Sequence, residues 1–407
     1  MDIADLTLAM RNTLRHGMRS AIAISAISFS VIALLLAGGF IEWIFWATRE
    51  NVIQTGMGHI RAVKPGYLES GAAEPFSYLL PATSAELSAL EAAPEVKGVA
   101  PRLSASGLIS HGETTLSFTG EGVDPEKDRL VNQYLQIRKG SDLSALDPKG
   151  IIVGEGLAAS LGVQPGDQVT LLATSASGGI NAVEGNVRGV FWTGVKAFDD
   201  AALRMPIGMS RELLRVSGSH IWVISLDRTE RTQVVLDQLR SQFKSDSLQF
   251  VPWFELFDFY NKTVALLSSQ LGVVRTMIGI IIVLSISNML IMNVLERTGE
   301  IGTLMAMGTR RRRIVRLFLS EGLVLALAGA ALGLLVGLVL AHIISAVGIP
   351  MPPPPGRSEG HSAEILVTWP VAGGAVVLAI GTTLLASLYP AWKASRLVIV
   401  DALRHNR

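Results

Sequence analysis

The stretch Met277-Ile-Gly-Ile-Ile-Ile-Val-Leu284 is the densest apolar run in the chain, and it carries no charge. It lies within an apolar block that extends over about residues 264–294. Three further blocks of the same kind occupy about residues 21–47, 318–347 and 365–389. Each block exceeds the ~20 residues that a helix needs to cross the hydrocarbon core of a bilayer. The sequence therefore predicts a membrane protein with four transmembrane helices.

The composition agrees with a chain that lies partly in lipid. Of its 407 residues, 49% are hydrophobic and 17% are charged, whereas an average soluble domain has about 25% charged residues. These values exclude a purely soluble enzyme, a disordered chain and a collagen-like chain. An outer-membrane barrel is excluded because its strands alternate between apolar and polar residues. The chain has no cysteine, so disulfides, thiolate nucleophiles and iron–sulfur clusters are excluded as well.

Basic residues near the ends of the blocks predict the orientation of the chain. They gather in the N-terminal segment, in the loop between the second and third blocks, and in the C-terminal tail. These three segments lie on the same side of a four-span chain, and the positive-inside rule assigns that side to the cytoplasm. Both termini are therefore predicted to be cytoplasmic. The basic residues are Arg11, Arg15, Arg19, Arg297, Arg310, Arg311, Arg312, Arg313, Arg316, Lys393, Arg396, Arg404 and Arg407.

The blocks and the segments between them predict the domain organisation. Two segments face outward: a large α+β domain between the first and second helices, and a short loop that contains four consecutive prolines, a stiff connector without backbone donors. The predicted parts are an amphipathic helix at 1–19, spans at 20–48, 263–295, 317–347 and 365–390, the outer domain at 49–262, a cytoplasmic helix and basic loop at 296–316, the Pro-rich loop at 348–364, and a cytoplasmic tail at 391–407.

The sequence of the outer domain predicts a mixture of strands and helices. Alternation predicts a strand at His59–Lys64 and a hairpin that turns at His111-Gly112-Glu113, and helical spacing is found at Ser84–Ala93 and Thr229–Phe243. No hydrolytic motif appears, and the histidines are isolated, so neither a catalytic site nor a metal site is predicted. The acidic pair Glu121 and Asp124 is interpreted as part of a solvated turn.

Small residues and aromatic residues mark the spans. Gly329, Gly333 and Gly337 recur every four residues, which places them on one helix face where another backbone can approach closely. The aromatic residues admit two interpretations: an interfacial aromatic belt, or an apolar entrance for a lipidic substrate between the first two spans. They are Trp43 and Trp46 on the first span, and Trp253, Phe254, Phe257 and Tyr260 before the second.

The loop between the second and third spans is the most informative segment. On a helix, Ile301, Leu304, Met305 and Gly308 share one face, and four consecutive arginines follow from residue 310. An apolar patch of this kind needs a partner. The pattern alone leaves open whether the helix docks on a protein or lies on the membrane surface.

The same loop, with matches elsewhere in the chain, resembles the MacB/FtsX-type permeases of ABC transporters, which include the lipoprotein-releasing LolC and LolE subunits. The matching residues are Glu296-Arg297-x-x-Glu300-Ile301-Gly302-x-Leu304-x-Ala306-Met307-Gly308, Glu321-Gly322 with the glycines of the third span, Tyr389-Pro390-Ala391-Trp392-Lys393-Ala394-Ser395-Arg396 in the tail, and Gly154-Glu155 to Val169 in the outer domain.

The resemblance implies a permease subunit of the bacterial inner membrane. Two such chains, identical or different, would work with two copies of a separate ABC ATPase subunit. This chain has no G-x-x-x-x-G-K-[ST] loop, so no cofactor is expected to bind directly and ATP would act through the partner. The resemblance implies that the ATPase docks on Glu296, Arg297, Glu300, Ile301, Leu304, Met305, Met307 and Gly308.

The resemblance also implies mechanotransmission, in which ATP turnover is relayed through long helices to the outer domain. The work would be extraction of lipoproteins or lipids, and membrane lipid would be a partner. The alternatives are a MacB-like tripartite export pump and an FtsX-like regulator of a periplasmic cell-wall hydrolase. LolC-like subunits hold a periplasmic chaperone with a hairpin that contains proline and basic residues. The corresponding residues 174–186 contain neither, which puts LolC-type chaperone capture in doubt or moves it to another subunit or loop. A periplasmic chaperone or adaptor stays a candidate partner. No nucleic-acid partner is expected.

Overall fold

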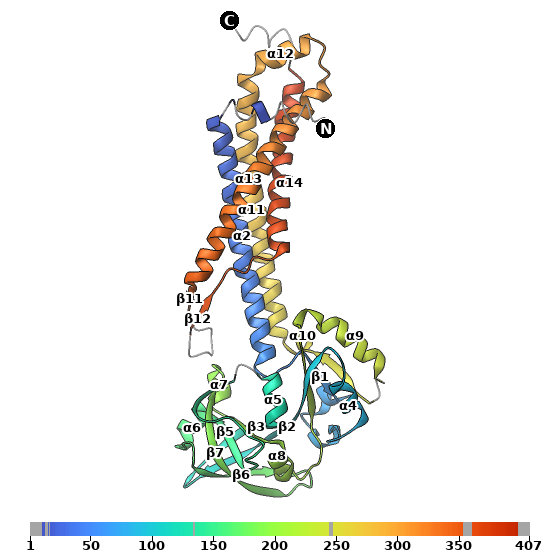
Figure 1. The fold of residues 1–407 in the computed structure, drawn as a ribbon, viewed down its shortest axis with the longest axis vertical. Helices are drawn as coiled ribbons and strands as arrows, with labels where there is room; N and C mark the ends of the chain where they lie inside the picture. Colours follow the sequence, from blue (N-terminus) through green and yellow to red (C-terminus); the bar gives the residue numbers. More distant parts are fainter. Residues whose placement is uncertain are drawn as a thin grey trace. The chain divides into compact units, whose positions relative to one another are not determined.

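The computed structural model of the chain describes residues 10–12, 15, 17–132, 135–243, 247–352 and 360–397. It divides into two compact units, shown in Figure 1. The helical unit consists of Met1–Trp46, Thr263–Pro350 and Ser362–Arg407, and the sheet unit of Ala47–Lys262 and Met351–His361.

Four helices of the structure are long and apolar enough to cross a membrane: α2 (Gly17–Gln54), α11 (Asp258–Glu296), α13 (Arg311–Val347) and α14 (Trp369–Ser395). At 1.5 Å per residue, a helix of this length reaches up to ~58 Å, whereas the hydrocarbon core is ~30 Å thick. The four predicted helices are confirmed, but each extends beyond its predicted span at one end or at both, and α14 begins four residues later than predicted. The predicted basic loop is wrong in part, because Arg311–Arg316 form the first turns of α13.

The helical unit has a core to which all four long helices contribute. Ile27 of α2 and Ile286 of α11 pack in it with Leu325 of α13 and Ala379 of α14. Each of these side chains is almost fully buried. The tail beyond residue 397, most of the predicted N-terminal amphipathic helix and prolines 353–355 lie outside the described residues. The short strands β11 (Ile349–Met351) and β12 (His361–Ala363) flank the Pro-rich loop and pair with each other.

The glycines of α13 face α2. A Cβ atom at Gly329 would lie 2.6 Å from Cβ of Ile27, and one at Gly333 would lie 2.7 Å from the backbone oxygen of Ser28. Ser28 also donates from Oγ to the carbonyl oxygen of Gly329, at 2.9 Å. The two backbones therefore approach too closely for any side chain at these two glycines.

We expect Gly333→Ala to lower the stability of the helical unit by about 1–3 kcal/mol, because the added carbon has no room and overpacking costs this much. The matched control is Gly337→Ala on the same face, where the added Cβ would lie at an ordinary 3.6 Å from Leu35. Thermal unfolding of the purified chain in detergent measures both. Equal melting temperatures for Gly333→Ala and the parent would contradict this prediction. They would show that α2 and α13 can move apart to admit the added carbon without a loss of stability.

The sheet unit contains a ten-stranded sheet in which six strands close into a ring. Each strand pairs with the next in the order β2, β3, β8, β5, β7, β6, and β6 pairs back with β2. The strands are β1 (Ile60–Val63), β2 (Val96–His111), β3 (Thr114–Val123), β4 (Gln136–Gly140), β5 (Gly150–Gly154), β6 (Gln168–Thr174), β7 (Ile180–Trp192), β8 (Ala202–Pro206), β9 (Ile221–Leu226) and β10 (Gln249–Pro252).

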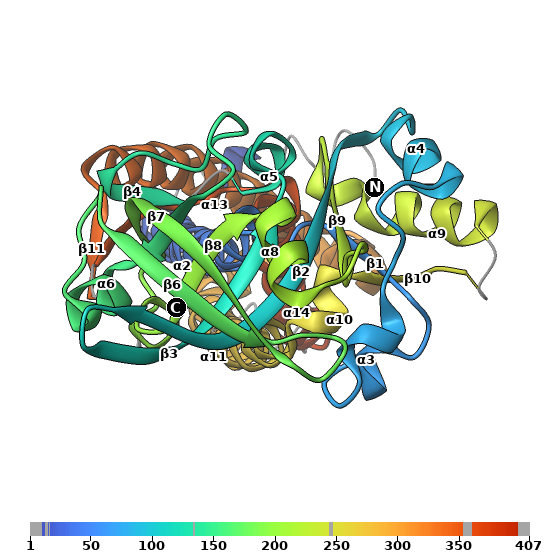
Figure 2. The same cartoon turned by 90° about the horizontal axis from the view of Figure 1, so that it is seen from below.

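A second lobe of the sheet unit uses the strand order β10, β1, β9, β2. Helices α4 (Ala85–Glu91) and α9 (Thr232–Gln242) bury leucine and valine side chains against its central strands. In Figure 2 these two helices lie on one side of the unit and most of the ring on the other. Strand β2 belongs to both lobes: its first half pairs with β9 and its second half with β3 and β6.

The sequence patterns of the outer domain are confirmed in outline. The expected strand appears as β1, and the expected hairpin is β2–β3, with Gly112 at φ 56° in its turn. The helix expected from Ser84 is α4, and Ser84 caps it by accepting from the amide of Leu87 at 3.1 Å. The remaining short helices are α3 (Tyr67–Ser70), η1 (Pro75–Tyr78), α5 (Pro125–Val131), α6 (Glu155–Leu161), α7 (Lys196–Asp199), α8 (Ile207–Leu214), η2 (Thr229–Arg231) and α10 (Trp253–Leu256).

Candidate functional site

The helix expected to dock on a partner is α12 (Thr298–Ala306). One side of it belongs to the core of the helical unit. Ile301 is 4% exposed and packs with Phe318 of α13, and Met305 packs against the same apolar cluster. Ile301 is therefore not available to a partner in this structure.

The surface of this segment lies at the end of α12. Leu304 is half-buried, whereas Met307 directly after the helix is 70% exposed. Gly308 is exposed and turns the chain with φ 86°, a conformation that glycine adopts without strain. The apolar surface that this segment offers to a partner is therefore concentrated around Met307.

The charged residues of the same segment form ion pairs within the helical unit. Arg297 donates to Glu300 at 3.1 Å and to Glu321 of α13 at 2.9 Å. Glu296 at the end of α11 pairs with Arg19 of α2. The structure therefore brings Glu296, Arg297 and Glu300 together with two residues that were not predicted as site residues, Arg19 and Glu321.

The predicted aromatic residues fall into the two units. In the sheet unit, the ring of Trp253 is 5% exposed and packs edge-on against Tyr260 and Phe254, with ring centroids 4.8 and 5.8 Å away. Phe257 contacts Phe259. In the helical unit, Trp43 is 8% and Trp46 is 43% exposed. The lipid entrance stays a prediction, and Trp46 is its most accessible tryptophan.

Helix α2 is joined to the strands of the sheet unit by a row of hydrogen bonds near its end. The backbone N–H of Leu226 donates to Nδ1 of His59 at 3.0 Å, so the neutral ring carries its proton on Nε2. Nε2 lies 3.1 Å from Oγ1 of Thr229, and that hydroxyl donates to Glu50 of α2 at 2.9 Å. Burial lowers the pKa of His59 to about 4, although the Glu50 carboxylate opposes this shift.

Two buried arginines pack beside the backbone that leaves α2. Both Arg102 of β2 and Arg204 of β8 pair with Asp128 of α5, at 2.6 and 2.9 Å, and both also contact Glu121 of β3. A Cβ atom at Gly56, which has φ 108°, would lie 2.9 Å from the Arg102 guanidinium. Burial opposes ionisation of Asp128, but the two arginines hold its pKa below the usual value. The interpretation of Glu121 as part of a solvated turn is wrong, because β3 places it in this ion cluster.

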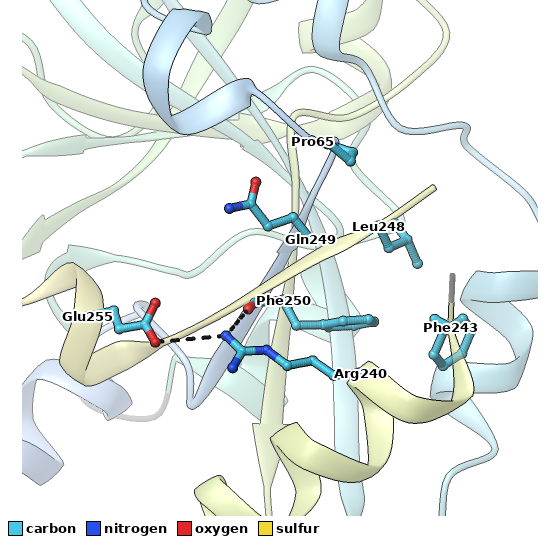
Figure 3. Close-up of a pocket in the computed structure, with 7 residues that line it drawn as sticks. All are labelled: Pro65, Arg240, Phe243, Leu248, Gln249, Phe250 and Glu255. Carbon is cyan, nitrogen blue, oxygen red and sulfur yellow. Dashed lines mark hydrogen bonds and ion pairs between the residues drawn. The ribbon is translucent and has the colours of Figure 1, made fainter. Parts of the chain in front are cut away.

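A cavity of about 260 Å³ lies beside β10 and the end of α9 (Figure 3). Arg240 reaches across it, donating to the carbonyl oxygen of Phe250 at 3.0 Å and pairing with Glu255 at 3.8 Å. The guanidinium thereby covers part of the edge strand. The lining residues are Pro65, Arg240, Phe243, Leu248, Gln249, Phe250 and Glu255. Within the described part of the chain, no group of three or more His, Cys, Asp and Glu side chains is placed to hold a metal ion.

Comparison with known families covers most of the chain. The model of the MacB-like periplasmic core domain matches residues 20–242, and the model of the FtsX-like permease C-terminal region matches residues 272–399. The chain belongs to the MacB/FtsX family of ABC transporter permeases. The expected resemblance is confirmed, and so is the architecture of four transmembrane helices with a large periplasmic domain between the first two. This permease is an inner membrane protein.

Individual relatives of the permease are distant. It is 22% identical to the lipoprotein-releasing system transmembrane protein LolE of Haemophilus influenzae, over 76% of this chain and 77% of that one. It is 24% identical to LolC of Xylella fastidiosa, over 77% and 79%. It is 26% identical to the macrolide export ATP-binding/permease protein MacB of Sodalis glossinidius, over 98% of this chain but only 60% of the length of that protein.

The hairpin expected at the position of the LolC-like chaperone-binding hairpin is short. Strand β6 ends at Thr174 and β7 begins at Ile180, so the connection is residues 175–179 and not 174–186 as expected. Ser175 closes it by donating to the carbonyl oxygen of Gly179 at 2.8 Å. Ile180 at the start of β7 is 78% exposed. Capture of a chaperone at this tip would have to use these few side chains.

Proposed function

We propose that this permease couples ATP hydrolysis in a separate ABC ATPase to the release of lipoproteins or lipids from the outer leaflet of the inner membrane. The observation that supports it best is the continuity of α2 and α11, each a single helix with residues in both units. A continuous helix carries a displacement along its axis without a hinge. No ATP-binding loop is present in the sequence, so two copies of a partner ATPase would supply the energy to two permease chains.

We further propose that the ATPase and both termini lie on the cytoplasmic side. The arginines of residues 310–316 and the positive-inside rule support this orientation. The chain lacks cysteine, so a single cysteine at Met307 can be tested with a membrane-impermeant maleimide on spheroplasts. Labelling of this cysteine before lysis would show that the orientation is the opposite of the one proposed.

Met307→Asp is expected to abolish binding of the ATPase while leaving the permease folded. The side chain is 70% exposed, so the charge costs the free permease little, but burial of an unpaired carboxylate under a docked ATPase would cost several kcal/mol. The measurement is co-purification and ATPase activity in nanodiscs, with Met307→Leu as the matched control. Normal values for Met307→Asp would move the docking surface away from the end of α12.

The proposed substrate is an acylated protein or lipid that enters beside Trp46. Each buried CH₂ of an acyl chain is worth about 0.8 kcal/mol, so an apolar surface would lower the cost of leaving the bilayer. We expect a photo-crosslinker at Trp46 to trap acylated protein without nucleotide and to lose it when ATP is trapped.

The matched control is a crosslinker at Trp369 of α14, which is 91% exposed and should capture phospholipid in every state. If the Trp46 crosslinker also captures only phospholipid, unchanged by nucleotide, the MacB-like export pump or the FtsX-like regulator becomes the better proposal.

A further inference from the structure

Glu321 is a buried carboxylate that two separate segments of the chain share. Its side chain is 4% exposed within the helical unit. Its Oε1 accepts from Nη1 of Arg297 at 2.9 Å and from Nδ2 of Asn12 at 2.7 Å. Arg297 directly precedes α12, and Asn12 belongs to the segment before α2. One carboxylate of α13 therefore holds both segments.

The neighbouring ion pairs extend this connection to the other spans. Glu296, the last residue of α11, pairs with Arg19 of α2. The adjacent Arg297 also donates to Glu300 within α12, and Glu300 lies 3.7 Å from Arg15. Residues 296 and 297 thus connect α2, α11, α12 and α13 within a few ångströms.

A small cavity lies inside this arrangement. Its volume is about 10 Å³, and Asn12, Arg19, Asn293 and Glu321 contribute to its wall. Oδ1 of Asn293 is buried and has no hydrogen-bond partner among the described residues. The volume is that of one water-sized probe. Met289, Leu290 and Leu325 form the apolar part of the wall, and its polar side chains offer partners for a single bound water. Such a water would satisfy Asn293 and join α11 to the same group.

We propose that Glu321 is the positioning residue of the cytoplasmic side: it fixes α12 and the N-terminal segment to α13, so that a displacement of α12 is passed to the spans as one body. The ion pair supplies specificity of position, because the other carboxylate that Arg297 contacts, Glu300, is exposed. The proposal deepens the proposed function and its consequence for transport rests on it, but the geometry can be tested on the permease alone.

The test uses spin labels on the full chain in nanodiscs, and the absence of native cysteine makes labelling specific. One pair of labels at Met307 and Leu327, both exposed, reports the position of α12 against α13. A second pair at Leu335 and Val377 reports the bundle itself. Pulsed electron resonance gives the distance distribution for each pair.

We expect Glu321→Gln to replace the single narrow Met307–Leu327 distance with a broad distribution and to leave the Leu335–Val377 distance unchanged. Glutamine keeps the size of the side chain and an acceptor for Asn12 but removes the charge that holds Arg297. The matched control is Glu300→Gln, which removes the exposed partner of the same arginine and should keep the narrow distance.

Exchanging the two charges distinguishes a role of Glu321 in positioning α12 from a general contribution of Glu321 to the stability of the fold. Arg297→Glu alone should broaden the distance, and Arg297→Glu combined with Glu321→Arg should restore it. An unchanged distribution in Glu321→Gln would overturn the proposal, as would failure of the exchange to restore it or equal broadening of the Leu335–Val377 pair. These outcomes are independent of Met307→Asp, which alone tests whether an ATPase docks on α12.

Discussion

Asp128→Asn is expected to destabilise the sheet unit by about 3–5 kcal/mol, because removing one partner of a buried ion pair costs this much. Arg102 and Arg204 are 4% and 5% exposed, and both bond to this carboxylate. Without it, they would keep only the partly exposed Glu121 as an anionic partner. For a unit of roughly 200 residues, a loss of this size lowers the melting temperature by about 10 °C. Thermal unfolding of the full chain, followed by the transition of the sheet unit, measures it.

Two variants separate the buried cluster from ordinary surface charge. Glu91→Gln removes the half-exposed partner of Lys127, the residue before Asp128, and should change stability by less than ~1 kcal/mol. Replacing Arg102 and Arg204 with methionine and Asp128 with leucine removes the three most buried charges of the cluster together. The remaining carboxylate, Glu121, is 31% exposed, so the triple variant should cost less than Asp128→Asn alone. If the triple variant is the least stable, the cluster contributes net stability through its charges.

The spans could be predicted from sequence because a long apolar run is unfavourable when exposed to water, so its expected location is the hydrocarbon core of the membrane. Their ends could not, since the part of a helix that lies outside lipid carries no hydropathy signal. The last turns of α2, through Asn51 and Gln54, are as polar as a loop. The hydrophobic pattern therefore places the membrane crossing but not the continuity of α2 and α11, on which the proposed function depends.

The ring of strands and the ion cluster could not be predicted because they depend on contacts between distant segments. Alternation within β2 shows that it is a strand, but not that β9, β3 and β6 all pair with it. Arg102 and Arg204 belong to strands about 100 residues apart, and each alone reads as an exposed surface residue. The sequence did indicate that Glu321 has a partner, since a carboxylate inside an apolar helix needs one. The spacing of the residues did not identify that partner as Arg297 or Asn12.

The second large effect is expected from acidification, through His59. Its pKa falls to about 4 in the folded protein, because burial of the ring disfavours the charged form. The unfolded chain has the ordinary value of about 6.5. Between pH 6.5 and 4 the unfolded state therefore binds a proton that the folded state does not, and the free energy of unfolding decreases as the pH is lowered. The contribution is fully present above pH ~6.5, and about 3 kcal/mol is lost by pH ~4.

The comparison with His59→Gln isolates this residue from the carboxylates that titrate in the same range. An amide side chain offers both an acceptor and a donor without a titratable proton, so the slope of melting temperature against pH should be shallower than in the parent. His220, whose pKa burial also lowers, is present in both proteins and cancels in the difference. Equal slopes would show that His59 contributes nothing to the pH dependence of stability, and so that its pKa is the same in the folded and the unfolded protein. A steeper slope in the parent would mean that protonation breaks the hydrogen bonds between β9, Thr229 and Glu50, and so loosens α2 where it meets the sheet.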